Sequence, residues 1–149
     1  MTAAAADWAL VVTVKAPEEQ VLAFAAHHLA LGAAALWIFF DDPDDPAYAR
    51  VSRLPGVRAF RCDAAHWARY NGRPARHQNR QARNALRAYR GCTQAWIGHI
   101  DIDEFILPDR PMGDILGAIP PAQPVVRMEP FEAMHDPTLP DDIFTARAF

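Results

Sequence analysis

Apolar residues gather in four short runs along the chain, at residues 8–14, 35–40, 57–62 and 95–100. The first two runs, WALVVTV and ALWIFF, are almost unbroken and are rich in valine or aromatic side chains. Such runs are typical of strands that are buried on both faces of a parallel sheet. The pattern therefore predicts four strands at these positions.

Helical spacing is found between the first two runs. Pro17 suits the first turn of a helix, the two glutamates that follow complement the helix dipole, and Gly32 favours a helix end. Strand, helix and strand in succession form a β-α-β unit, whose crossover is right-handed. The alternation of strands and helices predicts an α/β fold with a mostly parallel central sheet.

A second long helix is predicted over residues 75–89. Its predicted apolar face consists of Ala82, Ala85, Leu86 and Tyr89. Its arginines form a separate stripe, made of Arg76, Arg80, Arg83, Arg87 and Arg90. Farther along, the pattern predicts a short helix at 112–119 and another strand at 125–128, before prolines and acidic residues take over.

Length and composition are those of an ordinary globular domain. The chain has 149 residues, 51% of them hydrophobic, and a net charge of -3 that does not mark a nucleic-acid or membrane binder. No stretch approaches the ~20 apolar residues of a transmembrane helix, and we see no signal-peptide pattern. Cys62 and Cys92 lie in or beside apolar stretches and are expected to be free thiols. We therefore expect a cytoplasmic protein.

Polar residues follow each of the four predicted strands. Lys15 follows the first, Asp41 and Asp42 the second, Asp63 the third, and the triplet 101–103 the fourth. The carboxyl ends of parallel strands meet at one edge of a sheet, where open α/β sheets bind their ligands. The sequence therefore predicts a ligand site at this edge.

Asp101 and Asp103 flank a single isoleucine at the end of the fourth strand. In an extended backbone, alternation places both carboxylates on one side. Two such carboxylates could hold Mg²⁺ or Mn²⁺, with the other coordination positions open to water and phosphate oxygens. The cation would then neutralise a diphosphate leaving group. The alternative is a polar turn, because Asp-x-Asp is short and common by chance.

The other candidates also have structural alternatives. Asp41 or Asp42 could accept hydrogen bonds from a ribose or a base edge, although Asp and Pro are also favoured turn residues. Lys15 could contact phosphate. His135 is a candidate further metal or phosphate ligand, whereas the histidines at 27–28 are interpreted as packing or capping groups.

The arginine stripe is the main rival signal, because clustered guanidinium groups can bind nucleic-acid phosphates. The alternative is a solvated helix face in an arginine-rich chain. No aromatic residues interleave with these arginines, which weakens a single-strand-binding interpretation. Arg76 or Arg80, near the start of the helix, could instead reach a diphosphate.

Four blocks of the sequence resemble family-2-like glycosyltransferases of the GT-A type. They are Thr13-Val14-Lys15, residues 27–32 (HHLALG), Asp41-Asp42, and residues 96–105 (WIGHIDIDEF). The resemblance covers residues 8–108. It implies a GT-A fold, which is a Rossmann-like three-layer sandwich, a nucleoside-diphosphate sugar donor, and Mn²⁺ or Mg²⁺ held by Asp101 and Asp103.

The resemblance also implies roles for individual residues. The donor-binding candidates are Lys15, Asp41, Asp42, Gln78 or Gln81, and Asp101. Inverting members of the family use an acidic general base to deprotonate the acceptor hydroxyl. The candidates for this base are Glu129, Glu132 and Asp136.

These observations predict a single domain over residues 1–149, with a donor-binding core at 7–108 and a short acceptor-side region at 109–149. The predicted activity is metal-dependent transfer of a sugar from a nucleotide-sugar to a hydroxyl on a sugar, lipid or protein acceptor. The alternatives are a non-catalytic nucleotide-binding module of the same fold and an arginine-rich nucleic-acid-binding domain; we expect no nucleic-acid partner. The chain departs from the family where Lys15-Ala16-Pro17-Glu18 replaces the usual Lys-Asn-Glu.

Overall fold

The computed structural model describes residues 4–140, 142 and 145. The chain divides into two compact units, Met1–Ala118 and Ile119–Phe149. The first unit holds all the helices and strands assigned in the described residues. None of the helices found there is long and apolar enough to cross a bilayer.

The first unit alternates strands and helices, as the sequence predicts. Its strands are β1 (Trp8–Val14), β2 (Ala35–Phe40), β3 (Val57–Arg61) and β4 (Trp96–His99). Its helices are α1 (Glu18–Ala30), α2 (Tyr48–Val51), α3 (Ala64–Ala68), α4 (His77–Gly91) and α5 (Met112–Gly117). The four strands and three helices that the sequence predicts in this unit are confirmed to within about two residues at each end. The short helices α2 and α3 are additions that the pattern does not predict.

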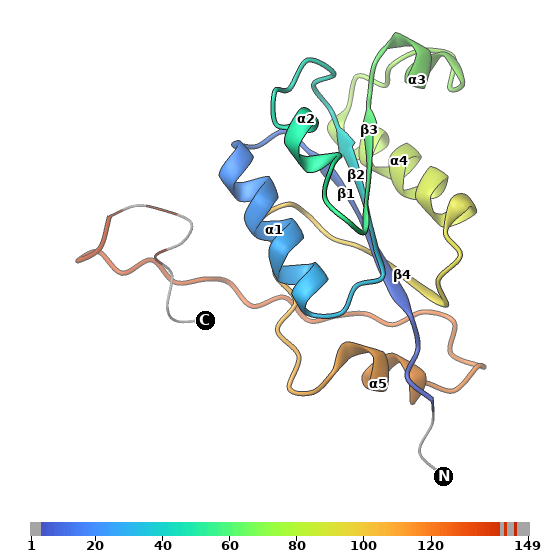
Figure 1. The fold of residues 1–149 in the computed structure, drawn as a ribbon, viewed down its shortest axis with the longest axis vertical. Helices are drawn as coiled ribbons and strands as arrows, with labels where there is room; N and C mark the ends of the chain where they lie inside the picture. The colour runs from blue at the N-terminus through green and yellow to red at the C-terminus, as the bar shows by residue number, and fades with distance from the viewer. Residues whose placement is uncertain (1–3, 141, 143–144, 146–149) are drawn as a thin grey trace. The chain divides into compact units, whose positions relative to one another are not determined.

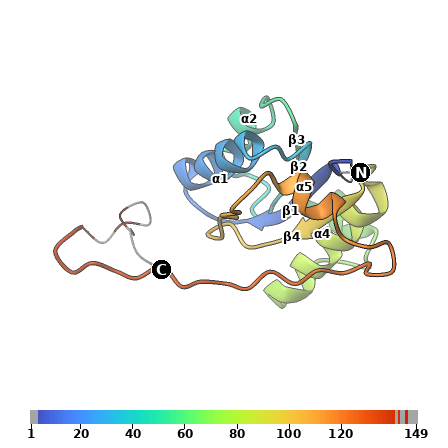
Figure 2. The same ribbon diagram turned by 90° about the horizontal axis from the view of Figure 1, so that it is seen from below.

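The four strands form one open sheet in the order β3-β2-β1-β4, and every neighbouring pair is parallel. Helices α1 and α2 cover one face, and α4 covers the other (Figures 1 and 2). The predicted α/β fold with a parallel sheet is therefore confirmed, and this architecture is compatible with a Rossmann-like fold.

Strands β1 and β2 form the centre of the core. Every residue of both strands is at most 5% exposed, which explains why their sequences show no alternation of apolar and polar residues. Val11, Trp37 and Phe39 pack with Trp67 of α3 and Ala88 of α4. Successive side chains of a strand point to opposite faces, so the intervening residues of β1 and β2 face α1.

The face of α4 that packs on the sheet shares only Ala85 with the predicted apolar face. Asn84 and Ala88 are fully buried, whereas Tyr89 is 69% exposed and Leu86 is 37% exposed. The prediction was wrong because the interior supplies hydrogen-bond partners for Asn84, so the helix turns a largely polar face inwards. Part of the arginine stripe therefore faces the rest of the fold.

The second unit has no strand at 125–128 in its described part, so that prediction is wrong. Val125 is 76% exposed and Met128 is 42% exposed. A strand needs a neighbouring strand to pair its backbone groups. The segment is also flanked by Pro124 and Pro130, which have no N–H to donate to a sheet.

Candidate ligand cleft at the carboxyl ends of the strands

A cleft of about 590 Å³ opens at the carboxyl ends of β1, β2 and β3. Its walls also include residues along the whole of α3 and the loop before α4. The lining residues are Lys15, Asp41, Asp42, Pro43, Cys62, Asp63, Ala64, Trp67, Ala68, Gly72 and Arg73. This volume lies within the range of small-molecule sites, ~300–1,000 Å³. The cleft therefore has the size of a ligand site and lies at the carboxyl ends of the strands, on the β2 and β3 side of the switch point between β1 and β4.

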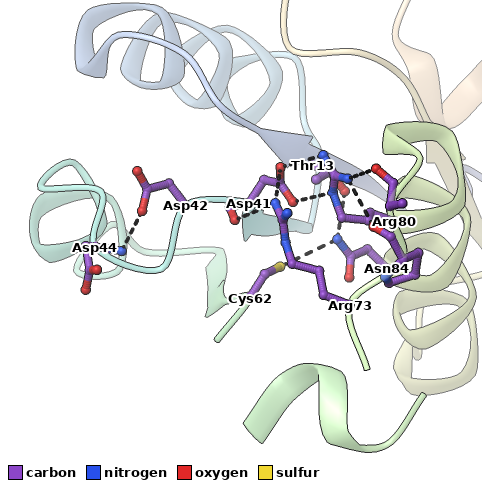
Figure 3. A network of polar contacts seen from close by, with 10 residues as sticks. Thr13, Asp41, Asp42, Asp44, Cys62, Arg73, Arg80 and Asn84 are labelled. Atoms are coloured by element: carbon purple, nitrogen blue, oxygen red, sulfur yellow. Dashed lines mark hydrogen bonds and ion pairs between the residues drawn. The ribbon is translucent and has the colours of Figure 1, made fainter. Parts of the chain in front are cut away.

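Asp41 is buried beside two arginines at one edge of this cleft (Figure 3). Its carboxylate accepts hydrogen bonds from Arg80 Nε at 2.8 Å and Nη2 at 3.0 Å, and from Arg73 Nη2 at 2.9 Å. Asp41 is 3% exposed and the side chain of Arg80 is 11% exposed, whereas the side chain of Arg73 is 47% exposed. Asp41 thus ties the end of β2 to α4 and holds Arg73 at the cleft.

Asp42 has a different environment, although it is the next residue. It is exposed, it lines the cleft, and one of its oxygens accepts a hydrogen bond from the backbone N–H of Asp44 at 2.9 Å. Asp45 accepts a similar bond from the N–H of Ala47 at 2.9 Å. The loop is therefore built by aspartate turns, and Asp42 is the better placed of the two adjacent aspartates to meet a ligand. Lys15 is also exposed at the cleft.

A buried polar network lies behind the cleft, between α3, α4 and β1. Arg87 Nη1 lies 2.8 Å from His66 Nδ1, and His66 Nε2 lies 2.9 Å from Asn84 Oδ1. Since a guanidinium can only donate, Nδ1 is the acceptor and Nε2 carries the proton. Asn84 Nδ2 then donates to Thr13 Oγ1 at 2.9 Å and faces Cys62 Sγ at 3.6 Å.

The burial of this network shifts the pKa values of its members. Burial lowers the pKa of His66, and the neighbouring positive charge of Arg87 lowers it further, so the imidazole is neutral. Burial raises the pKa of the Cys62 thiol to about 12. Sequence reasoning missed His66 and Asn84. The helical spacing of Arg80, Asn84 and Arg87 gave no signal of burial, because polar residues that share a helix face are ordinarily assigned to solvent.

The acidic segment after β4 is a turn rather than an extended strand end. The backbone N–H of Glu104 donates to the carbonyl of Asp101 at 3.1 Å, and Glu104 Oε2 accepts from the N–H of Asp101 at 2.8 Å. The prediction of an extended backbone from Asp101 to Asp103 is therefore wrong, and strand alternation does not apply to the two carboxylates. Asp101, Asp103 and Glu104 are all exposed, and Gln81 Nε2 donates to Asp101 Oδ1 at 2.7 Å.

The structure brings some of the predicted site residues together and leaves others apart. Lys15, Asp41 and Asp42 line one cleft, whereas Asp101 and Asp103 are not among its lining residues. Gln81 contacts Asp101, and Gln78 is exposed on the first turn of α4. The exposed residues of the second unit include Glu129, Glu132, His135 and Asp136.

Asp136, one of the three base candidates, lies in a short turn with Thr138. Its carboxylate accepts hydrogen bonds from Thr138 Oγ1 at 2.7 Å and from Thr138 N–H at 2.9 Å. These bonds stabilise the charged form and lower the pKa of Asp136. A carboxylate with a lowered pKa is a weaker general base, which disfavours Asp136 in that role.

The acidic turn offers oxygen ligands, which is the donor type that Mg²⁺ and Mn²⁺ prefer. Within the described residues, no group of three or more His, Cys, Asp or Glu side chains is placed to hold a metal ion. Mg²⁺ is commonly held by one or two carboxylates together with substrate phosphates. The residues of the turn therefore fit a cation that arrives with a diphosphate better than a cation bound by protein alone.

Contacts within the chain already occupy several arginines of the predicted stripe. Arg80 pairs with Asp41, the guanidinium of Arg87 lies 4.4 Å from the ring centre of Phe60, and that of Arg83 lies 5.6 Å from the ring centre of Tyr70. Stacked and paired guanidinium groups are less available to phosphates of a nucleic acid. The geometry thus gives little support to nucleic-acid binding through α4.

Comparisons with known protein families, with curated proteins and with solved structures gave no match. The function is therefore inferred from the residues and geometry of the cleft and the acidic turn.

Proposed function

We propose that this chain carries the nucleotide-sugar-binding part of a metal-dependent glycosyltransferase of the GT-A type. The observation that carries the proposal is the 590 Å³ cleft at the carboxyl ends of the strands, lined by Lys15, Asp41 and Asp42. These three residues are among those that the resemblance assigns to the nucleotide. They directly follow two neighbouring strands of the sheet, β1 and β2.

The strand order supports the proposal. From β1 the chain moves outwards through β2 to β3, and it returns to the other side of β1 with β4. The carboxyl ends of β1 and β4 thus flank the topological switch point, where open α/β sheets bind their ligands. Lys15 directly follows β1, and the acidic turn Asp101–Glu104 follows β4.

The charges suggest that the cleft and the turn would bind different parts of the donor. Among the cleft residues, Lys15 and Arg73 are balanced by three aspartates, and such a mixed polar lining suits the hydroxyls of a ribose and the edge of a base. The turn has three carboxylates and suits the cation that accompanies the diphosphate. When bound, the cation supplies Lewis-acid stabilisation of the leaving nucleoside diphosphate.

In this mechanism the chain itself binds and orients the donor. Lys15 and Asp42 would contact the nucleotide, and Asp101 and Asp103 would hold the cation. Asp41 acts indirectly, because it fixes Arg73 beside the ligand. The rate enhancement comes from positioning and charge stabilisation. The resemblance also implies an acidic general base, for which Glu129 and Glu132 stay candidates.

The proposal is tested by thermal unfolding with UDP, GDP and CMP, each with and without Mn²⁺. A ligand that binds only the folded form increases the free energy of unfolding, by ~2.7 kcal/mol at one hundred times its Kd. The melting temperature rises as a result. We expect one nucleotide to stabilise the protein, more strongly with Mn²⁺, and we expect Asp103→Ala to lose the Mn²⁺-dependent part. Asp109→Ala is the control, since Asp109 is an exposed acid just beyond the turn. No response to any nucleotide would refute the proposal.

A second candidate is a nucleotide-binding module without transferase activity. The observation that favours it is that Asp101 and Glu104 are bonded to each other within the turn, which leaves fewer oxygens for a cation. This candidate predicts nucleotide binding with no hydrolysis of a nucleotide-sugar above background, which a release assay for free UDP or GDP distinguishes.

A further inference from the structure

Two adjacent histidines at the end of α1 bind the same residue beyond the acidic turn. His27 Nε2 lies 2.8 Å from the carbonyl oxygen of Ile106. The backbone N–H of Ile106 donates to His28 Nε2 at 3.3 Å. Both polar groups of one peptide segment are thus satisfied by imidazoles from a helix that lies 78 or 79 residues earlier in the chain.

These contacts require opposite tautomers on the two rings. The carbonyl of Ile106 only accepts, so His27 carries its proton on Nε2. His28 Nδ1 lies 2.9 Å from the carbonyl of Phe24 and therefore carries the proton there, which leaves Nε2 free to accept from Ile106. His28 is fully buried, and burial lowers its pKa to about 4, so this ring stays neutral near pH 7.

Ring contacts reinforce the two hydrogen bonds. The ring of Phe105 is stacked on His28, with centres 5.8 Å apart and planes at 19°. It meets His27 edge-on at 5.2 Å and Phe24 at 6.3 Å. Residues 105 and 106 are therefore held on α1 by hydrogen bonds and by aromatic packing at the same time.

The acidic turn lies between two fixed points. On its amino-terminal side, Gln81 of α4 donates to Asp101, and β4 runs beside β1. On its carboxyl-terminal side, Phe105 and Ile106 are bound to α1. A turn that is fixed at both ends keeps its carboxylates in one place, and sites of this kind depend on such supporting contacts.

We propose that His27 and His28 are positioning residues that hold the Asp101–Glu104 turn at the edge of the sheet. Their contact with Ile106 follows from the hydrogen bonds, whereas the use of the turn as a cation site rests on the proposed function. The histidines act through Phe105 and Ile106, the two residues beyond the turn that they contact. Their role is that of a tether between α1 and the segment after β4.

The first test concerns the protein without ligands. Two-bond ¹H–¹⁵N NMR spectra of the histidine rings near pH 7 are expected to show the proton on Nε2 of His27 and on Nδ1 of His28. Identical tautomers on the two rings would overturn the proposal.

The second test uses a matched pair of variants at His27, which is only half-buried, so the fold is expected to survive both changes. His27→Gln keeps an N–H donor, and His27→Leu removes it with little change in size. Hydrogen exchange of the amides at 101–106 is expected to be about fivefold faster in His27→Leu, as befits the loss of one hydrogen bond, and within about twofold of the parent in His27→Gln. Equal exchange in all three proteins would overturn the proposal.

The third test measures the affinity of UDP with Mn²⁺ by calorimetry. We expect His27→Leu to bind about fivefold more weakly, and His27→Gln to bind as the parent does. If exchange responds but the affinity does not change, the positioning role is overturned. If the parent itself binds no nucleotide while the tautomers and exchange follow the expectation, the tether stands and the proposed function fails.

Discussion

The adjacent residues Asp41 and Asp42 allow a structural role to be separated from a binding role. We expect Asp41→Asn to destabilise the fold, and Asp42→Asn to leave its stability nearly unchanged. Asp41 is 3% exposed and is paired with two arginines. Asp42 is exposed, and its carboxylate accepts a hydrogen bond from the backbone N–H of Asp44 in a local turn. The two substitutions are chemically identical, which makes each the control for the other.

The magnitude follows from the contacts of Asp41. Removing one partner of a buried ion pair costs ~3–5 kcal/mol, because it leaves the other charge buried and unpaired. Arg80 keeps two acceptors, the carbonyls of Pro74 and Ala75, at 3.1 and 2.8 Å, which reduces this cost. Arg73 is half-exposed, so its pair with Asp41 contributes only ~1 kcal/mol or less. We therefore expect Asp41→Asn to cost about 3 kcal/mol.

Thermal unfolding and urea unfolding, both followed by circular dichroism, measure the difference in stability between Asp41→Asn and Asp42→Asn. For a domain of this size ~1 kcal/mol corresponds to ~2–4 °C, so the melting temperature is expected to fall by about 6–12 °C in Asp41→Asn. Asp42→Asn is expected to stay within ~0.5 kcal/mol of the parent. It should instead weaken the binding of the stabilising nucleotide, by about tenfold if one charge-assisted hydrogen bond is lost. Equal stabilities of the two variants would refute the distinction between a structural Asp41 and a ligand-facing Asp42.

Three further predictions follow from buried groups. Burial lowers the pKa of His28 from 6.5 in the unfolded chain to about 4 in the fold, so the unfolded chain binds more protons between these two pH values. The stability that depends on neutral His28 is therefore full above pH 6.5 and falls by up to about 3 kcal/mol towards pH 4. Urea unfolding across this range should show a smaller dependence of stability on pH in His28→Leu. Asn84→Ala should cost about 2–3 kcal/mol in the same assay, because it leaves buried partners unsatisfied, whereas Tyr89→Ala on the exposed face of α4 should stay within ~0.5 kcal/mol. Alkylation at pH 8, followed by mass spectrometry, should modify the half-buried Cys92 and spare Cys62 until the protein unfolds, and modification of Cys62 first would contradict the burial and raised pKa of its thiol.

The strands were predictable from the sequence because their burial leaves a direct trace in the pattern. β1 and β2 are covered on both faces, so polar residues are excluded from almost every position. The same rule places the residues that follow the strands at one edge of the sheet, and it correctly groups Lys15, Asp41 and Asp42. These inferences depend only on local sequence and on the geometry of parallel sheets.

The orientation of α4 was not predictable in this way. Whether Asn84 is buried depends on Thr13 and His66, which lie 71 and 18 residues away in sequence. A polar residue at a helical position is normally assigned to solvent unless its partners are known. Arg73 was missed for a similar reason, because its partner Asp41 lies 32 residues earlier in the chain. The loop that carries Arg73 also passes through Asn71 and Gly72, both with positive φ, so its path does not follow from a regular pattern.

The acidic turn illustrates a choice that the sequence left open. Asp-Ile-Asp-Glu after a strand is compatible with either an extended strand end or a turn, because its alternating residues suit a strand whereas aspartate favours turns. The side chain of Glu104 decides between them, since it reaches back to the N–H of Asp101 and closes the turn. Tertiary contacts from Gln81 and the histidines of α1 then fix its location.

The polar inner face of α4 has a consequence for how this fold tolerates mutation. Apolar side chains can repack in several arrangements that still exclude water, but hydrogen bonds are directional and accept few alternative arrangements. The hydrogen bonds of Asn84 therefore fix the rotation of α4 about its own axis relative to the sheet. The same helix carries Arg80 and Gln81, so their directions are fixed as well. Substitutions that fill the space of Asn84 with a hydrocarbon could preserve a compact, well-expressed protein while rotating these two side chains out of place. Expression level alone would then be a poor guide to whether a homologue or a designed variant retains a working cleft.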